Sequence, residues 1–116
     1  MEKVRIDFKA VGSQDLERIS DFKTYATGTI NYIESHIELS SAWDEFETVY
    51  AIWWTDFGQK ESVIDSDGMT IVPAEMLNRS GTLKMNLCAS IVEDGILKAR
   101  NTTYPVDVLE LTRAVI

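Results

Sequence analysis

The chain has 116 residues, is 45% hydrophobic and carries 19 acidic against 11 basic residues, which gives a formal net charge of −8. This length and composition predict one folded domain over residues 1–116, and the scattered Lys and Arg argue against a nucleic-acid partner, because phosphate backbones require a concentrated basic surface. No apolar run reaches the ~18 residues of a membrane span and the first residues do not form a secretory signal, so we expect no membrane partner and synthesis in a cytoplasm.

The first predicted element is a strand over residues 3–11, in which apolar and charged residues alternate. This period of two predicts a half-buried strand with one wet face. Residues 16–25 are harder to assign, because their apolar residues recur at a spacing of three, which would also suit one or two helical turns. We favour an irregular loop there, with at most one helical turn, and we predict the next strand over residues 28–39.

Residues 46–55 are predicted to form the central strand, because they are apolar at both odd and even positions. The two sets are Val49, Ala51 and Trp53 on one side and Tyr50, Ile52 and Trp54 on the other. A strand that is apolar on both faces lies in the middle of a covered sheet or beneath a partner subunit.

The rest of the chain alternates short apolar runs with turn residues. Asp65-Ser66-Asp67-Gly68 predicts a tight hairpin turn, and Pro73 predicts a single helical turn over about residues 73–78. Residues 82–92 alternate most regularly and lead into a hairpin at residues 93–95, before a closing strand over residues 104–108. These signals predict an all-β fold: an antiparallel immunoglobulin-like or jelly-roll-like β-sandwich with one short helical turn.

Aromatic residues in the middle of the chain are the binding or interface candidates: Trp43, Tyr50, Trp53 and Trp54. Adjacent Trp53 and Trp54 must point to opposite faces of one strand, so one of them is expected in the core. We expect the outward one to contact another subunit, because Trp is enriched at interface hot spots. Filling a crevice in the same chain and stacking on a sugar ring are the two alternatives.

No set of residues predicts catalysis or metal binding. Glu34, His36 and Glu38 share one face of a predicted strand, but carboxylates on a solvated strand face are ordinary. The turn at residues 65–68 lacks the closing bidentate Glu that a calcium loop requires. Cys88 is the only cysteine, which excludes an intramolecular disulfide and a Cys-based zinc site. We therefore expect no enzyme activity, no metal and no cofactor.

One ordered series of segments is more specific than a general β pattern. It runs through Trp43, the aromatic strand ending in Trp53 and Trp54, the segment Asp67–Leu77 with its Pro73 turn, the strand led by Gly81, the Asp94-Gly95 hairpin and the Thr-rich entry to residues 104–108. This order resembles the small β-sandwich domains of tail and baseplate proteins of phages that infect Gram-positive bacteria. The N-terminal domain of upper baseplate proteins is the nearest type.

The resemblance implies a structural virion component of a phage tail tip or baseplate, acting through protein–protein assembly. The implied partners are further copies of the chain, as a trimer or hexamer, and other phage tail proteins. Such families have no catalytic residues, so the resemblance assigns none. A carbohydrate-binding module or host-wall adhesin domain, with a host cell-wall glycan as its ligand, is the alternative.

Overall fold

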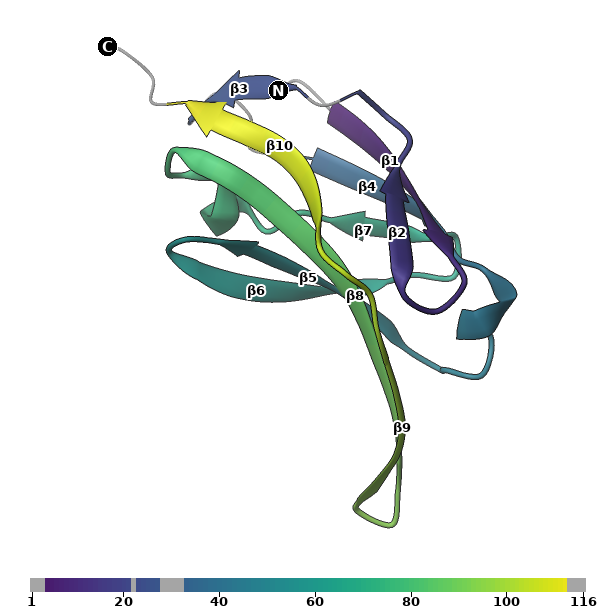
Figure 1. Ribbon diagram of the computed structural model, residues 1–116. Helices are drawn as coiled ribbons and strands as arrows, with labels where there is room; N and C mark the ends of the chain where they lie inside the picture. The colour runs from purple at the N-terminus through teal and green to yellow at the C-terminus, as the bar shows by residue number, and fades with distance from the viewer. Residues whose placement is uncertain (1–3, 22, 28–32, 113–116) are drawn as a thin grey trace.

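The computed structural model describes residues 4–21, 23–27 and 33–112, which form two packed β-sheets (Figure 1). The four-stranded sheet has the order β2-β1-β4-β7 and comprises β1 (Val4–Val11), β2 (Asp15–Arg18), β4 (Ile33–Glu38) and β7 (Met69–Ile71). The six-stranded sheet has the order β3-β10-β8-β5-β6, with β9 paired to β8, and comprises β3 (Thr24–Ala26), β5 (Val49–Thr55), β6 (Gly58–Ile64), β8 (Gly81–Glu93), β9 (Ile96–Thr102) and β10 (Val106–Thr112).

Two short 3₁₀ turns, η1 (Ser41–Trp43) and η2 (Ala74–Leu77), complete the regular structure of the described residues. The predicted all-β sandwich is thus confirmed, as is the single helical turn after Pro73. Met76 and Leu77 of η2 are buried, so this turn adds apolar side chains to the core. Within the described ranges no helix is long and apolar enough to cross a membrane.

The core lies between the sheets and follows from the alternation of each long strand. In β1 the buried side chains are Ile6, Phe8 and Ala10, and in β8 they are Leu83, Met85, Leu87 and Ala89. Successive residues of a strand point to opposite faces, so each of these sets forms one apolar surface of its sheet. In β10 the register shifts between Asp107 and Leu109, and Val108 and Leu109 are both buried there.

The predicted sandwich is present, but its sheets are mixed rather than purely antiparallel, because two strand pairs are parallel. β1 runs parallel to β4, from the pair Val4 and Ile33 to the pair Lys9 and Glu38. β10 runs parallel to β3. Parallel neighbours need a crossover connection rather than a tight turn, so no hairpin-turn signal in the sequence marks these two pairings.

The irregular loop favoured for residues 16–25 is wrong at its two ends, because residues 16–18 belong to β2 and residues 24–25 to β3. Gly12 has φ 65° and lies in the turn that reverses the chain, so that β2 pairs antiparallel with β1. The Arg18 Nη1 atom donates a hydrogen bond of 2.6 Å to the Asp107 carbonyl, 89 residues further along the chain. β2 is thus held by β1 across a short turn and by a side-chain hydrogen bond to β10. Residues 28–32, the start of the strand predicted over residues 28–39, lie outside the described residues.

The predicted turn at residues 65–68 is present, but it connects two different sheets. Asp65 Oδ1 accepts backbone hydrogen bonds from Asp67 and Met69, each of 2.9 Å, and Gly68 has φ 81°. The turn therefore carries the chain from β6 in the six-stranded sheet to β7 in the four-stranded sheet. It fixes how the two layers are joined at this edge.

Candidate interaction surface

The outer face of the six-stranded sheet carries the aromatic side chains that the core does not use. In β5 the inward residues Val49, Ala51 and Trp53 are buried, whereas Tyr50, Ile52 and Trp54 are half-buried. Because side chains alternate along a strand, the second set lies together on the outer face. We call Tyr50, Ile52 and Trp54 the outer stripe.

The neighbouring strands give the outer stripe an apolar end and a polar rim. Val63 of β6 and Cys88 of β8 lie opposite Tyr50, so the stripe is apolar across three strands at this end. At the other end Trp54 lies beside Lys84, whose Nζ is 2.8 Å from Asp107 Oδ1. Between these ends Ile52 lies opposite Glu61 of β6 and Asn86 of β8, so polar groups border the middle of the stripe. Apolar contact residues bordered by polar groups are the arrangement found in protein–protein interfaces.

Two of the four residues predicted for binding or interface contacts belong to the core instead. Trp43 is 2% exposed and its Nε1 donates a 3.0 Å hydrogen bond to the Gly12 carbonyl. Trp53 is 0% exposed and its Nε1 donates a 2.8 Å hydrogen bond to Ser62 Oγ. Neither ring can present a face to a ligand. The prediction that Trp53 and Trp54 point to opposite faces is confirmed, and Tyr50 and Trp54 remain the surface candidates.

The indole N–H of Trp54 is enclosed but has no acceptor among the described residues. A buried N–H without an acceptor costs about 1–3 kcal/mol, and buried Trp normally has a partner for this group. The hydrogen-bonding capacity of the Trp54 indole is therefore not satisfied by the described residues of this chain.

The other residues considered from the sequence do not come together into a reactive site. His36 Nε2 lies 3.2 Å from Glu34 Oε2 on the solvent side of β4, and Glu38 lies beyond them at the exposed end of the strand. Among the described residues no group of three or more His, Cys, Asp or Glu side chains is placed to hold a metal ion. Cys88 is half-buried on the outer face, 3.8 Å from Thr102 Oγ1.

Several exposed apolar residues lie at the two ends of the molecule and were not among the predicted site residues. Val92, Ile96 and Leu97 lie around the turn between β8 and β9, and Phe57 lies in the turn between β5 and β6. A signal was present in the length of the strand over residues 82–92, because a strand longer than its neighbours must extend beyond them.

These features define the class of the chain as a two-layer β-sandwich with mixed sheets and an apolar outer face. A solved structure with a similar fold is the N-terminal domain of ORF48 of phage TP901-1, with a TM-score of 0.53, 11% sequence identity, and coverage of 95% of this chain and 99% of that chain. At this identity the similarity establishes the fold alone. No protein family matches the sequence of this chain, and no curated protein matches it.

Proposed function

We propose that this chain is a structural component of a phage tail tip or baseplate, located in the virion, that acts through protein–protein assembly and has no enzyme activity. The fold shared with a phage domain supports the phage assignment. The observation that carries the assembly role is the outer stripe, an aromatic surface on a sheet face. In its sheet β5 lies between β8 and β6, and Tyr50, Ile52 and Trp54 on its outer face stay half-exposed in the single chain.

The chemistry of the outer stripe suits a protein partner. Tyr and Trp supply large apolar contact areas and are enriched in the residues that dominate interface energies. Val63, beside Tyr50, is 55% exposed and adds aliphatic surface at the sheet edge. Further copies of the chain, arranged as a trimer or hexamer, and other phage tail proteins are the partners we propose.

The alternative function, binding of a host cell-wall glycan, has weaker support from the geometry. A sugar platform needs exposed aromatic rings, and the indoles of Trp43 and Trp53 are inside the core. Trp54 is the one indole left on the surface, and its N–H is enclosed.

Val63→Glu tests the proposed interface. Val63 is 55% exposed in the single chain, so a glutamate there should be tolerated in the fold, whereas a charge buried in an interface is costly. We expect the apparent mass of the wild-type oligomer, measured by size-exclusion chromatography with light scattering, to fall, with self-association at least tenfold weaker. Val11→Glu is the matched control, because Val11 is 42% exposed at the end of β1 in the other sheet.

Three results would contradict the proposal. The first is a wild-type chain that is monomeric at micromolar concentrations and captures no tail protein in a pull-down. The second is an equal loss of association in Val63→Glu and Val11→Glu. The third is sedimentation with purified Gram-positive cell wall that Trp54→Ala abolishes while the fold is retained, which would favour the adhesin alternative.

A further inference from the structure

The β8–β9 hairpin extends out of the sandwich as an arm (Figure 1). β8 pairs with β10 as far as Met85 and with β5 as far as Cys88, and beyond that point β9 is its sole partner. Ala89 and Asn101 still lie against the body, since Ala89 is buried and Asn101 Nδ2 is 3.5 Å from the Ala42 carbonyl. We define the arm as residues 90–100.

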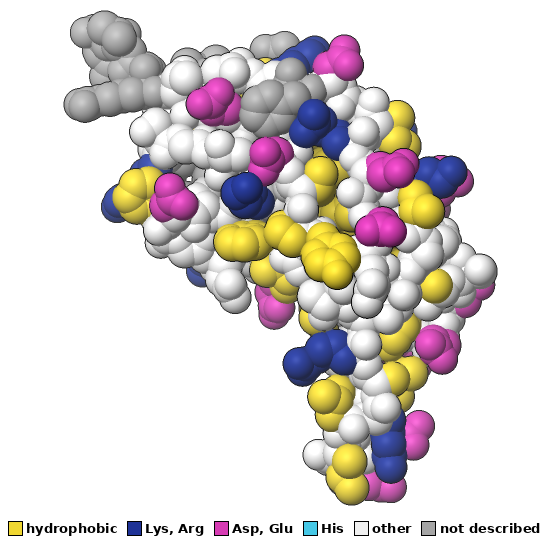
Figure 2. Space-filling view, viewed as in Figure 1, with side chains coloured by type: hydrophobic (Ala, Val, Ile, Leu, Met, Phe, Trp, Pro, Cys, Tyr) yellow, Lys and Arg dark blue, Asp and Glu magenta, His cyan; other side chains and the backbone are white. Residues whose placement is uncertain are grey.

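The arm tip is apolar on both of its faces. Val92 and Leu97 are cross-strand partners and share one face, whereas Ile96 lies opposite Glu93 on the face that also carries Ile91. Val92, Ile96 and Leu97 are all exposed, and Figure 2 shows hydrophobic side chains along the projecting arm. A two-stranded hairpin is marginally stable in water. A tip with apolar groups on both sides therefore suits insertion into a partner rather than contact along one face.

The turn of the arm is tight and acidic. Asp94 and Gly95 have φ of 51° and 76°, and positive φ at both central residues is the type I′ geometry that matches the twist of a hairpin. Glu93 and Asp94 place two carboxylates at the tip, whereas Lys98 and Arg100 lie further back along the arm. A complementary site would be apolar with cationic groups at its edge.

A pocket with these properties lies at the other end of the same molecule. It has a volume of about 330 Å³ and is lined by residues that include Phe57, Lys60, Glu75, Met76 and Arg79. The Phe57 ring is 62% exposed, with the Arg79 guanidinium 4.6 Å from its centroid. Lys60 is 3.9 Å from Glu75, and both are exposed. Among the lining residues two cations stand against one acid, and Asp56 of the adjacent turn adds a second acid, so the charges of this end are balanced in a chain that is acidic as a whole. We call it the end pocket.

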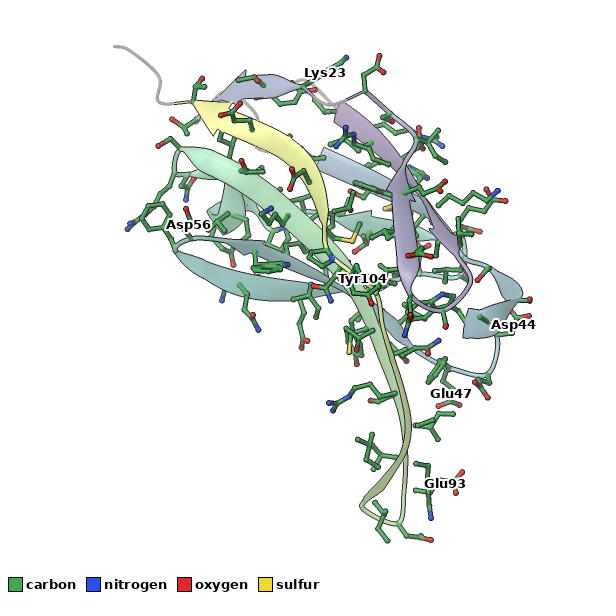
Figure 3. The ribbon with its side chains drawn as sticks, in the orientation of Figure 1. Lys23, Asp44, Glu47, Asp56, Glu93 and Tyr104 are labelled. Carbon is green, nitrogen blue, oxygen red and sulfur yellow. The ribbon has the colours of Figure 1, made fainter. Side chains whose placement is uncertain are left out.

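The arm and the end pocket lie at opposite ends of β8. Trp54, next to the β5–β6 turn, pairs with Lys84 near the start of β8, and the arm is formed by its last residues. Figure 3 shows Asp56 of that turn and Glu93 of the arm at well-separated extremities of the molecule, whose longest dimension is 53 Å. One chain therefore cannot fill its own pocket with its own arm.

We propose that the arm tip of one chain inserts into the end pocket of a second copy, with Ile96 and Leu97 packing on Phe57 and Met76 and the acidic turn facing Lys60 and Arg79. This inference rests on the proposed assembly role and specifies one of its joints. Because the two contact surfaces differ, the joint is heterologous, and repetition of it produces a ring or an open chain of subunits.

The test uses two variants that each remove one half of the joint. Ile96→Glu places a charge on the arm tip, and Phe57→Glu places one in the end pocket. Both positions are exposed in the single chain, so both variants should keep the fold. We expect each variant alone to self-associate at least tenfold more weakly than wild type by light scattering. Through this joint an equimolar mixture should gain 1:1 pairing and no further growth, because one intact arm and one intact pocket remain.

Ile19→Glu is the matched control, since Ile19 and Ile96 are both 59% exposed and Ile19 lies beside the four-stranded sheet. A charge reversal adds a second readout: Glu93→Lys should weaken association, and Lys60→Glu in the same chain should restore it. The joint is overturned if the mixture gives no dimer, or if Ile19→Glu dissociates the assembly as strongly as Ile96→Glu. If the wild-type oligomer survives both arm and pocket variants but is lost in Val63→Glu, the joint fails while the proposed function stands.

Discussion

A short chain of hydrogen bonds through the half-buried Ser62 and the buried Thr70 links the two sheets to Trp53. The Trp53 indole donates to Ser62 Oγ at 2.8 Å, and Ser62 Oγ lies 2.6 Å from Thr70 Oγ1. Ser62 belongs to β6 and Thr70 to β7, so this chain crosses between the layers. By contrast, Ser35 Oγ is buried on β4 and has no hydrogen-bond partner among the described residues.

The contrast between these two serines gives a prediction on stability. Ser62→Ala should lower the free energy of unfolding by about 1–3 kcal/mol, because it leaves the buried Trp53 N–H without an acceptor. Ser35→Ala, the control, should be neutral or slightly stabilising, because it removes a buried hydroxyl that makes no bond. Urea denaturation followed by Trp fluorescence measures both. Equal losses of unfolding free energy in the two variants would show that the Trp53–Ser62 hydrogen bond does not contribute to stability.

Two glycines with positive φ allow backbone strain to be separated from steric clash. Gly12 has φ 65° and open space where a Cβ would lie, whereas a Cβ on Gly68, with φ 81°, would collide with the Ile37 carbonyl oxygen. Gly12→Ala should therefore cost about 1–2 kcal/mol, the usual penalty of the left-handed conformation. Gly68→Ala should cost clearly more, because the turn between the sheets must also move. Thermal denaturation of both variants checks the order, and a larger loss at Gly12 would contradict it.

At the level of single elements, the sequence predicted those strands that are recognisable from their own alternation of apolar and polar residues, whichever strands they pair with. In Val4–Val11 and Gly81–Glu93, apolar and polar residues alternate so regularly that the sequence alone shows which side chains face the core. Pro73 marked the short helical turn equally clearly. Asp15–Arg18 pairs with β1 across the short turn at residues 12–14, so a local turn signal was present there, whereas Thr24–Ala26 pairs with β10 near the far end of the chain, so local residues could not reveal it. Burial was hardest to predict for Trp43, which enters the core from a short 3₁₀ turn outside any strand.

The arm is the element whose dynamics should depend most on assembly. Its amides bond only between β8 and β9, so local opening can expose them without unfolding the sandwich. In Ile96→Glu, amides of residues 90–100 should exchange with deuterium much faster than those of Lys84 and Met85, which have paired strands on both sides. In the wild-type assembly the arm amides should become protected. Hydrogen-exchange mass spectrometry measures this, and an arm that exchanges equally fast in both states would argue against insertion.

For the molecule as a whole, association should be visible as a concentration-dependent Tm. Only folded chains carry an intact arm and pocket, so assembly stabilises the native state by mass action. The Tm of wild type should rise by several degrees between low and high micromolar concentration, since each tenfold step is worth about 1.4 kcal/mol. The Tm of Phe57→Glu should change much less over the same range. Differential scanning calorimetry provides the measurement, and parallel behaviour of the two proteins would contradict the joint.

The position of β10 has a consequence for how the chain is made. β10 lies between β8 and β3, and its backbone joins Lys23 to Glu110 and Thr27 to Thr112 through hydrogen bonds of 3.0 and 2.8 Å. When only the first 105 residues have been translated, β10 is missing. The backbone groups of Gly81–Met85 that pair with β10 are then unpaired, and β3 has no neighbouring strand. We expect the sandwich to close only after translation of Val106–Thr112, which makes early release or a truncated message harmful to folding far upstream of the missing residues.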